Sequence, residues 1–177
     1  METVKYQGVF VKLTEEEIEG ATWERVYLKS GVQVFPMTDD GKFYLIEERR
    51  PHEKNPIRLK FVTGLMDKEG EDPLDTANRE LQEEIGFKAD KLEIINHRHA
   101  TGTINNHFYQ VLATGLTKSK IPNPDGEDTI VSIKAYSIDE IYELLDSGKL
   151  PWSMGALGII KIQRMHLKKS KLIKTKN

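Results

Sequence analysis

The chain has 177 residues, a formal net charge of −2 and 31% charged residues, a composition that suits one soluble domain with a small appendage. The near-neutral charge gives the chain as a whole no bias toward polyanions. The absence of cysteine excludes disulfides, thiolate catalysis and cysteine zinc sites.

In chain order, the first 30 residues predict short β segments at 3–13 and 22–29, interrupted by an acidic turn at Thr14–Gly20. Two apolar runs follow at 32–37 and 42–49, and the turn signal between them predicts a hairpin. Further strands are expected at 91–100, 106–116 and 129–138, with a polar loop at Thr117–Asp128. Helices are expected at Ser137–Leu145 and Met154–Leu167. This order predicts an α/β fold, a mixed sheet sandwiched between helices.

The clearest element is a helix predicted over Pro73–Ile85. Asp72 is placed as its N-cap, proline is favoured at the first helical position, and Gly86 ends the helix. Apolar residues recur at three- and four-residue spacing and predict the buried stripe, which consists of Leu74, Ala77, Leu81 and Ile85.

Three carboxylates share another face of the same helix. Glu80, Glu83 and Glu84 stand at positions i, i+3 and i+4, where like charges repel by a few tenths of a kcal/mol per pair. A solvated acidic face is the simpler reading of such a pattern, but a bound cation explains three glutamates together. Carboxylate oxygens without cysteine or paired histidine favour Mg²⁺, for which Mn²⁺ substitutes.

The stretch Gly64–Phe87 resembles the Nudix box, in which a glycine and a glutamate precede an Arg-Glu-apolar-any-Glu-Glu-any-Gly helix. From Glu71 the match is complete through Arg79 and the three helix glutamates, whereas Gly64 precedes Glu71 by six residues instead of five. The resemblance implies a Nudix α/β/α sandwich. It also implies that Glu80, Glu83 and Glu84 bind metal with the main-chain carbonyl of Thr63, and that Arg79 holds a box glutamate, for which Glu71 is the candidate.

Other segments resemble the ADP-ribose pyrophosphatase-like branch of Nudix hydrolases. Glu47–Pro51, Leu59–Asp67 and Glu140–Trp152 are similar to segments of that branch, and Lys60 stands where the branch has glutamate. The likeness implies a homodimer that exchanges an antiparallel β extension, residues 1–30, ahead of a hydrolase domain at 31–177. Arg49 and Arg50 are candidate ligands of the diphosphate.

The general base is expected on the polar loop, where Glu127 lies just before a strand and Asp125 and Asp128 are rivals. A solvated acidic turn is the alternative reading of that loop, and Glu83 is another candidate base. Trp23 and Tyr6 are candidates for stacking on the nucleobase, with core or dimer packing as the favoured alternative.

The expected reaction is Mg²⁺-dependent cleavage of nucleoside diphosphate sugars, such as ADP-ribose or GDP-mannose, to a nucleoside monophosphate and a sugar phosphate. The alternatives are pyrophosphohydrolysis of nucleoside triphosphates or RNA 5′ ends, and a non-catalytic nucleotide-binding module of the same fold. The complete set of box glutamates argues against the non-catalytic module.

The last lysine-rich segment, Lys161–Lys176, is compatible with RNA or anionic lipid, but a solvated helix face is favoured. We therefore expect no nucleic-acid partner. No apolar run reaches the roughly 20 residues that span a bilayer, and the N-terminus lacks a signal-peptide core. A cytoplasmic protein without membrane contact is expected.

Overall fold

The computed structural model describes residues 1–68, 70–122 and 129–174. Within these ranges, seven strands form one mixed sheet, in which β8 pairs with β9, and three strands form a second, antiparallel sheet. The strands are β1 (Thr3–Gln7), β2 (Val11–Ile18), β3 (Ala21–Leu28), β4 (Gly31–Pro36), β5 (Phe43–Arg49), β6 (Ile57–Lys60), β7 (Val62–Leu65), β8 (Phe87–Thr101), β9 (Ile104–Lys118) and β10 (Ile130–Tyr136). The helical elements are α1 (Pro73–Glu80), η1 (Leu81–Ile85), α2 (Ile138–Asp146), η2 (Trp152–Met154) and α3 (Ala156–Lys174).

Strand β4 lies between β9, to which it is parallel, and the edge strand β7, to which it is antiparallel, and all of its residues are buried. Alternation along the strands sends Phe35 and Leu112 into a core cluster with α2 and α3. Val34 and Val111 point to the opposite face and pack with α1. The sheet is thus covered by α1 on one face and by α2 and α3 on the other, which confirms the expected mixed α/β sandwich.

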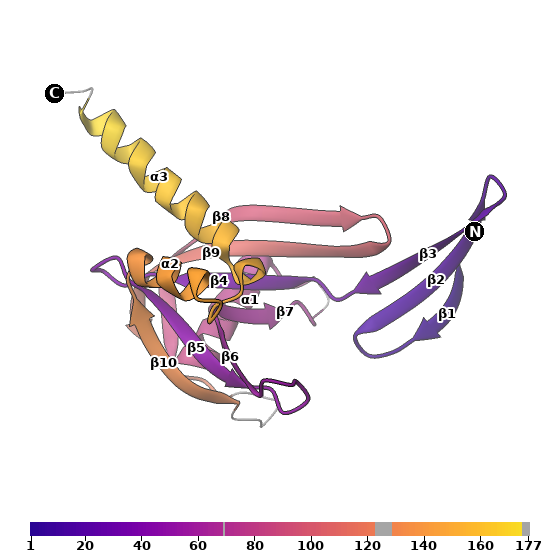
Figure 1. Cartoon of the computed structure of the whole chain (residues 1–177), viewed down its shortest axis with the longest axis horizontal. Coiled ribbons are helices and arrows are strands. Elements are labelled where there is room, and N and C mark those ends of the chain that lie inside the picture. Colours follow the sequence, from indigo (N-terminus) through magenta and orange to yellow (C-terminus); the bar gives the residue numbers. More distant parts are fainter. Residues whose placement is uncertain (69, 123–128, 175–177) are drawn as a thin grey trace.

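The N-terminal strands β1, β2 and β3 form an antiparallel meander that projects from the rest of the molecule (Figure 1). The predicted acidic turn at Thr14–Gly20 is wrong, because β2 continues through Ile18 and the chain reverses only at Glu19 and Gly20. Cations on the neighbouring strands explain the difference. Lys5 pairs with Glu15 and Arg25 with Glu16, so the acidic residues are accommodated across the strands.

The predicted hairpin of β4 and β5 is also wrong. The turn itself forms, with the amide of Gly41 donating to the carbonyl of Thr38 at 2.9 Å. The segments on either side of the turn share an isolated antiparallel β-bridge, between Met37 and Phe43, and no strand ladder of β4 with β5 forms among the described residues. Both edges of β4 are already occupied by β7 and β9, so β5 pairs instead with β6 and β10.

The C-terminal elements follow the sequence signals. Ser137 caps α2 through a reciprocal capping box with Glu140, and Ile141 and Leu145 form the buried side of that helix. The helix expected at Met154–Leu167 begins at Ala156 and extends to Lys174. None of the helices in the described ranges is long and apolar enough to span a membrane.

Candidate active site

The carboxylate-bearing helix forms over the residues that the sequence indicates. The Asp72 side chain accepts a hydrogen bond from the amide of Leu74 at 2.7 Å, and Gly86 ends the helix with φ 74°. The last turn, Leu81–Ile85, widens into a π-helix, a local form that recurs at functional sites. The three glutamates therefore lie at the junction of the regular helix and this wider turn.

Arg79 joins three of the carboxylates. Its Nη1 donates to Glu80 at 2.8 Å and to Glu83 at 3.0 Å, and its Nε donates to Glu71 at 3.1 Å. The longer loop between Gly64 and Glu71 still brings Glu71 to the guanidinium. A planar fork that bonds several carboxylates fixes their orientation. Burial by itself lowers the pKa of Arg79, but the hydrogen bond to Glu71 and the negative charges of Glu80 and Glu83 outweigh it and raise the pKa above its ordinary value.

Glu84 has a different cation. The Nζ of Lys60 lies 3.4 Å from Glu84 Oε1, 3.0 Å from Glu48 Oε2 and 2.9 Å from the Thr63 hydroxyl. The amide of Thr63 also donates to Glu84 Oε2 at 3.3 Å. Thr63 is thus in direct contact with a helix carboxylate. The cluster contains two cations, of which Arg79 bonds Glu71, Glu80 and Glu83, whereas Lys60 bonds Glu84 and Glu48.

Sequence reasoning did not assign a role to Lys60 or Glu48. The alternation of side chains along a strand could have identified these two residues. Ile46 packs toward α1, and Glu48, two residues further along β5, points to the same face of the strand. Lys60 pairs with Ile46 across β5 and β6 and precedes Val62 by two residues, which gives it the same orientation. Recognising this required knowing which face of these strands α1 covers.

Gly64 lies against Glu80, and its lack of a side chain makes room for that carboxyl group. A Cβ at Gly64 would lie 2.1 Å from Glu80 Cδ, a distance that no real contact allows. We expect Gly64→Ala to displace Glu80, to lower turnover by roughly 10²-fold and to cost about 1–3 kcal/mol of stability. Gly102→Ala is the matched control, because no atom lies within 4 Å of its added Cβ. Equal turnover in both variants would show that the position of Glu80 is unimportant.

Burial dominates the electrostatics of two helix carboxylates. It raises the pKa of Glu80 to about 7 against the opposing effect of Arg79, and it raises the pKa of Glu84 to about 7 against that of Lys60. Their side chains are each 12% exposed. Both carboxylates are enclosed and resist ionisation, although each has a cation beside it. A further positive charge in the site would therefore stabilise their ionised forms.

These pKa values predict how the stability of the metal-free protein depends on pH. The folded state binds more protons than the unfolded state between pH 4.5, the ordinary pKa, and about 7. The free energy of unfolding should therefore fall as pH rises through this window, by up to about 3 kcal/mol per carboxyl group. Urea unfolding in EDTA measures it. Glu80→Gln with Glu84→Gln should flatten the slope, and an unchanged slope would contradict the assignment.

The donor set fits a hard divalent cation. Glu80, Glu83 and Glu84 offer carboxylate oxygens, the ligands that Mg²⁺ and Mn²⁺ prefer, and Glu84 lies against the backbone of Thr63. Across the described ranges, no three acidic or histidine side chains already form a metal cage. In this arrangement, Arg79 and Lys60 engage oxygens of these carboxylates.

The other candidate residues lie at different distances from the cluster. Arg50 donates to Glu48 at 3.2 Å and to Glu53 at 2.6 Å, so it is linked through Glu48 to Lys60. Arg49 ends β5 and is exposed. Trp23 and Tyr6 lie on the projecting N-terminal strands with 55% and 58% of their surface exposed. Glu127, Asp125 and Asp128 fall outside the described residues.

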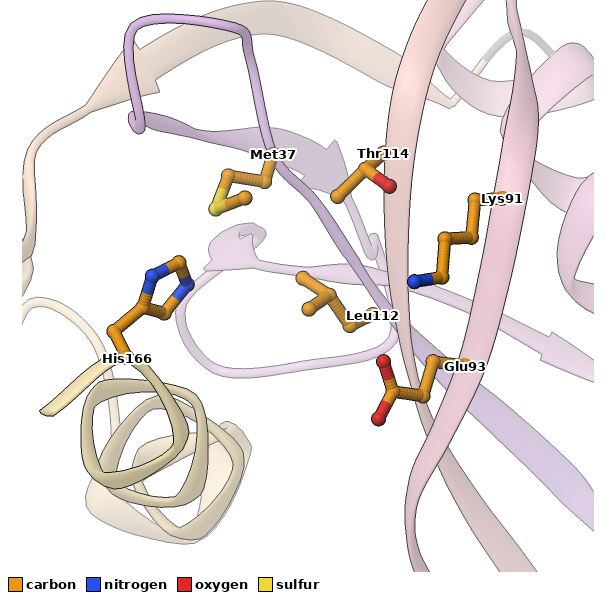
Figure 2. Close-up of a pocket in the computed structure, with 6 residues that line it drawn as sticks. All are labelled: Met37, Lys91, Glu93, Leu112, Thr114 and His166. Atoms are coloured by element: carbon orange, nitrogen blue, oxygen red, sulfur yellow. The ribbon is translucent and has the colours of Figure 1, made fainter. Parts of the chain in front are cut away.

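A small cavity beneath α3 is separate from this site (Figure 2). It measures about 120 Å³ and is lined by Met37, Lys91, Glu93, Leu112, Thr114 and His166. Leu112 packs on the α3 side of the sheet, whereas its neighbour Val111 packs on the α1 side. The cavity therefore lies across the sheet from the glutamates, and ligand pockets are usually several times larger.

Comparison with known proteins identifies the family to which this fold and carboxylate cluster belong. The NUDIX domain matches residues 28–154, and the chain belongs to this family. Structurally it is similar to a crystal structure of ADP compounds hydrolase, with a TM-score of 0.75 and 20% identity over 95% of both chains. That likeness shows the shared fold.

Curated relatives are similar over much of the chain. A methanol dehydrogenase activator of Bacillus methanolicus is 27% identical over 96% of both chains. An ADP-ribose pyrophosphatase of Bacillus subtilis is 28% identical over 80% of this chain and 79% of its own length. An ADP-ribose pyrophosphatase of Mycobacterium tuberculosis is 27% identical over 74% of this chain and 63% of its own. The chain is thus an ADP-ribose pyrophosphatase-like Nudix hydrolase, an enzyme that acts on pyrophosphate bonds.

Proposed function

We propose that this enzyme hydrolyses the diphosphate of nucleoside diphosphate sugars, such as ADP-ribose or GDP-mannose, with Mg²⁺ as cofactor and Mn²⁺ as a substitute. The products are a nucleoside monophosphate and a sugar phosphate. The observation that carries the proposal is the largely enclosed cluster within the matched NUDIX domain, in which Arg79 bonds Glu80 and Glu83 and Lys60 pairs with Glu84. The relatives named ADP-ribose pyrophosphatase support the choice of substrate class.

The roles of the residues follow from their chemistry. When bound, Mg²⁺ would neutralise charge on the diphosphate oxygens and lower the pKa of the attacking water. Glu80, Glu83, Glu84 and the Thr63 carbonyl are the proposed ligands of that ion. Arg79 holds the carboxylates in place, with Glu71 and Gly64 as structural support.

Substrate recognition is proposed for residues around the cluster. Arg50 and Arg49 would bind the diphosphate, since guanidinium groups match phosphate oxygens. Trp23 and Tyr6, both on the β extension, would stack on the nucleobase. Glu127 is the proposed general base, with Asp125, Asp128 and Glu83 as alternatives.

A substrate panel tests the proposed reaction. Purified enzyme with Mg²⁺ would be offered ADP-ribose, GDP-mannose and UDP-sugars beside ATP, GTP and 5′-triphosphorylated RNA, with separation of the products. We expect cleavage of one or more nucleotide sugars to a monophosphate and a sugar phosphate. Strong cleavage of a triphosphate with none of the nucleotide sugars would favour the triphosphate or RNA 5′-end reaction. Binding of nucleotides without any cleavage would favour a non-catalytic module.

We also propose that residues 1–30 form a β extension exchanged in a homodimer and that residues 31–177 form the hydrolase domain. Strand β3 meets β9 at only two positions, Val26 with Ile104 and Tyr27 with Asn105. Large apolar side chains are exposed along the projecting strands, namely Val4, Tyr6, Val9, Phe10 and Trp23. Such an uncovered surface is typical of a subunit interface.

Deletion of residues 1–30 should therefore convert a homodimer into monomers or aggregates, because the remaining partner surface would be left uncovered. Light scattering coupled to size exclusion at micromolar concentration measures the mass of both proteins. A wild-type chain that is monomeric under these conditions would refute the dimer.

We also propose a cytoplasmic location, which cell fractionation tests.

A further inference from the structure

Lys60 is a buried cation inside the acidic cluster. It ends β6, and only 4% of its surface is exposed. The ammonium group is surrounded by acceptors, with Thr63 Oγ1 at 2.9 Å, Glu48 Oε2 at 3.0 Å and Glu84 Oε1 at 3.4 Å. Three acceptors match the three N–H donors of an ammonium, so the side chain is held in one position.

The surroundings of Lys60 exclude a direct role in holding substrate. Its three N–H donors are used within the protein and its ammonium group is enclosed. Lys60 therefore has no N–H group left to hydrogen-bond a diphosphate that enters from solvent. Burial of an isolated charge is costly, but Glu48 and Glu84 on either side offset that cost. The site therefore carries a fixed positive charge between two carboxylates.

A divalent ion and an ammonium compete for such a position. Without Lys60, Glu48 and Glu84 would be two enclosed carboxylates converging on one point, an arrangement that binds Mg²⁺ or Mn²⁺. With Lys60 present, one oxygen of Glu84 is engaged, and an ion near that residue is repelled by the ammonium. Arg79 differs from Lys60 in its position, because it hydrogen-bonds to the other carboxylates of the cluster, those of Glu80, Glu83 and Glu71.

We propose that Lys60 is a built-in cation that takes the place of a divalent ion between Glu48 and Glu84 and thereby limits how many metal ions the active site binds and how tightly. This inference deepens the proposed function and rests on its metal site. It assigns Lys60 as a positioning residue that sets the metal requirement of the enzyme, without contact with the substrate.

Titration with Mn²⁺, followed by the electron paramagnetic resonance signal of the free ion, tests the proposal without any turnover. Lys60→Gln should bind an additional Mn²⁺ ion, or bind Mn²⁺ about tenfold more tightly than wild type. Lys60→Met, which keeps the apolar stem, should behave alike, and Lys60→Arg, which keeps the charge, should resemble wild type. Unchanged or weaker Mn²⁺ binding in the uncharged variants would overturn the proposal, since a lysine that merely props up Glu84 predicts weaker binding.

Two further variants complete the experiment. Lys161→Gln is the matched control, because Lys161 is half-buried on α3 and bonds only to neutral oxygens of Ile95 and Asn96. Glu48→Gln removes a negative charge beside Lys60 and leaves the positive charge of Lys60 in place. The ammonium group then has one fewer carboxylate to offset its charge, so this variant should bind Mn²⁺ more weakly. Unchanged binding in Glu48→Gln would overturn the proposal even if the Lys60 variants fail to fold. A wild-type enzyme that binds no Mn²⁺ would instead contradict the proposed function itself.

Discussion

Glu83→Gln and Glu84→Gln are each expected to lower kcat by at least about 10²-fold while leaving the fold intact. Glutamine keeps the size of the side chain but loses the charge that attracts a divalent ion. Glu83 is 7% exposed and accepts from Arg79, and Glu84 accepts from Thr63 and Lys60, so an amide in either place also disturbs a contact. Steady-state kinetics at increasing Mg²⁺ measures the loss.

The control for this experiment is Glu143→Gln, which changes an exposed glutamate on α2 and should leave kcat unchanged. Circular dichroism and thermal melting in EDTA separate loss of activity from loss of folding. Near-normal kcat in both helix variants at saturating Mg²⁺ would remove these carboxylates from the metal site.

The second large effect is expected from Glu127→Gln, with a fall in kcat of about 10² to 10⁴ and little change in substrate binding. The physical reason is that removal of a general base leaves the attacking water without an acceptor for its proton. The position of Glu127 in an acidic stretch of the sequence, three residues before the start of β10 at Ile130, motivates the choice. Single-turnover rates together with KM, measured across pH, separate the chemical step from binding.

Variants of the neighbouring carboxylates provide the comparison for Glu127. Asp125→Asn and Asp128→Asn should retain most of the activity, and the fall in rate at low pH, where the general base becomes protonated, should persist in both. If Asp128→Asn or Glu83→Gln loses the rate and Glu127→Gln keeps it, the base is one of those residues instead.

Local signals predicted the carboxylate helix well. The Asp72 cap, the stop at Gly86 and the apolar stripe all act within one segment, so the helix bounds follow from neighbouring residues. The π-turn at Leu81–Ile85 was not foreseen, because no residue pattern distinguishes it from a regular last turn. The capping box of Ser137 likewise fixed the start of α2.

Errors arose where pairing depends on distant parts of the chain. The turn after β4 looked like a hairpin, yet β7 and β9 occupy the edges of β4. The acidic run in β2 looked like a turn until Lys5 and Arg25 were placed opposite it. Lys60 and Glu48 were overlooked as site residues for the same reason, since only the packing of β5 and β6 against α1 brings them to Glu84.

Metal-dependent hydrolysis can be followed by a phosphorus-31 NMR time course of ADP-ribose with wild-type enzyme, first in EDTA and then after addition of excess Mg²⁺. Metal-dependent hydrolysis by the carboxylate cluster predicts that the diphosphate resonances persist in EDTA. After Mg²⁺ they should give way to two phosphomonoester resonances, those of AMP and ribose 5-phosphate. GDP-mannose, run in parallel, covers a different base and sugar. Diphosphate resonances that remain unchanged with Mg²⁺ for both compounds would contradict the account.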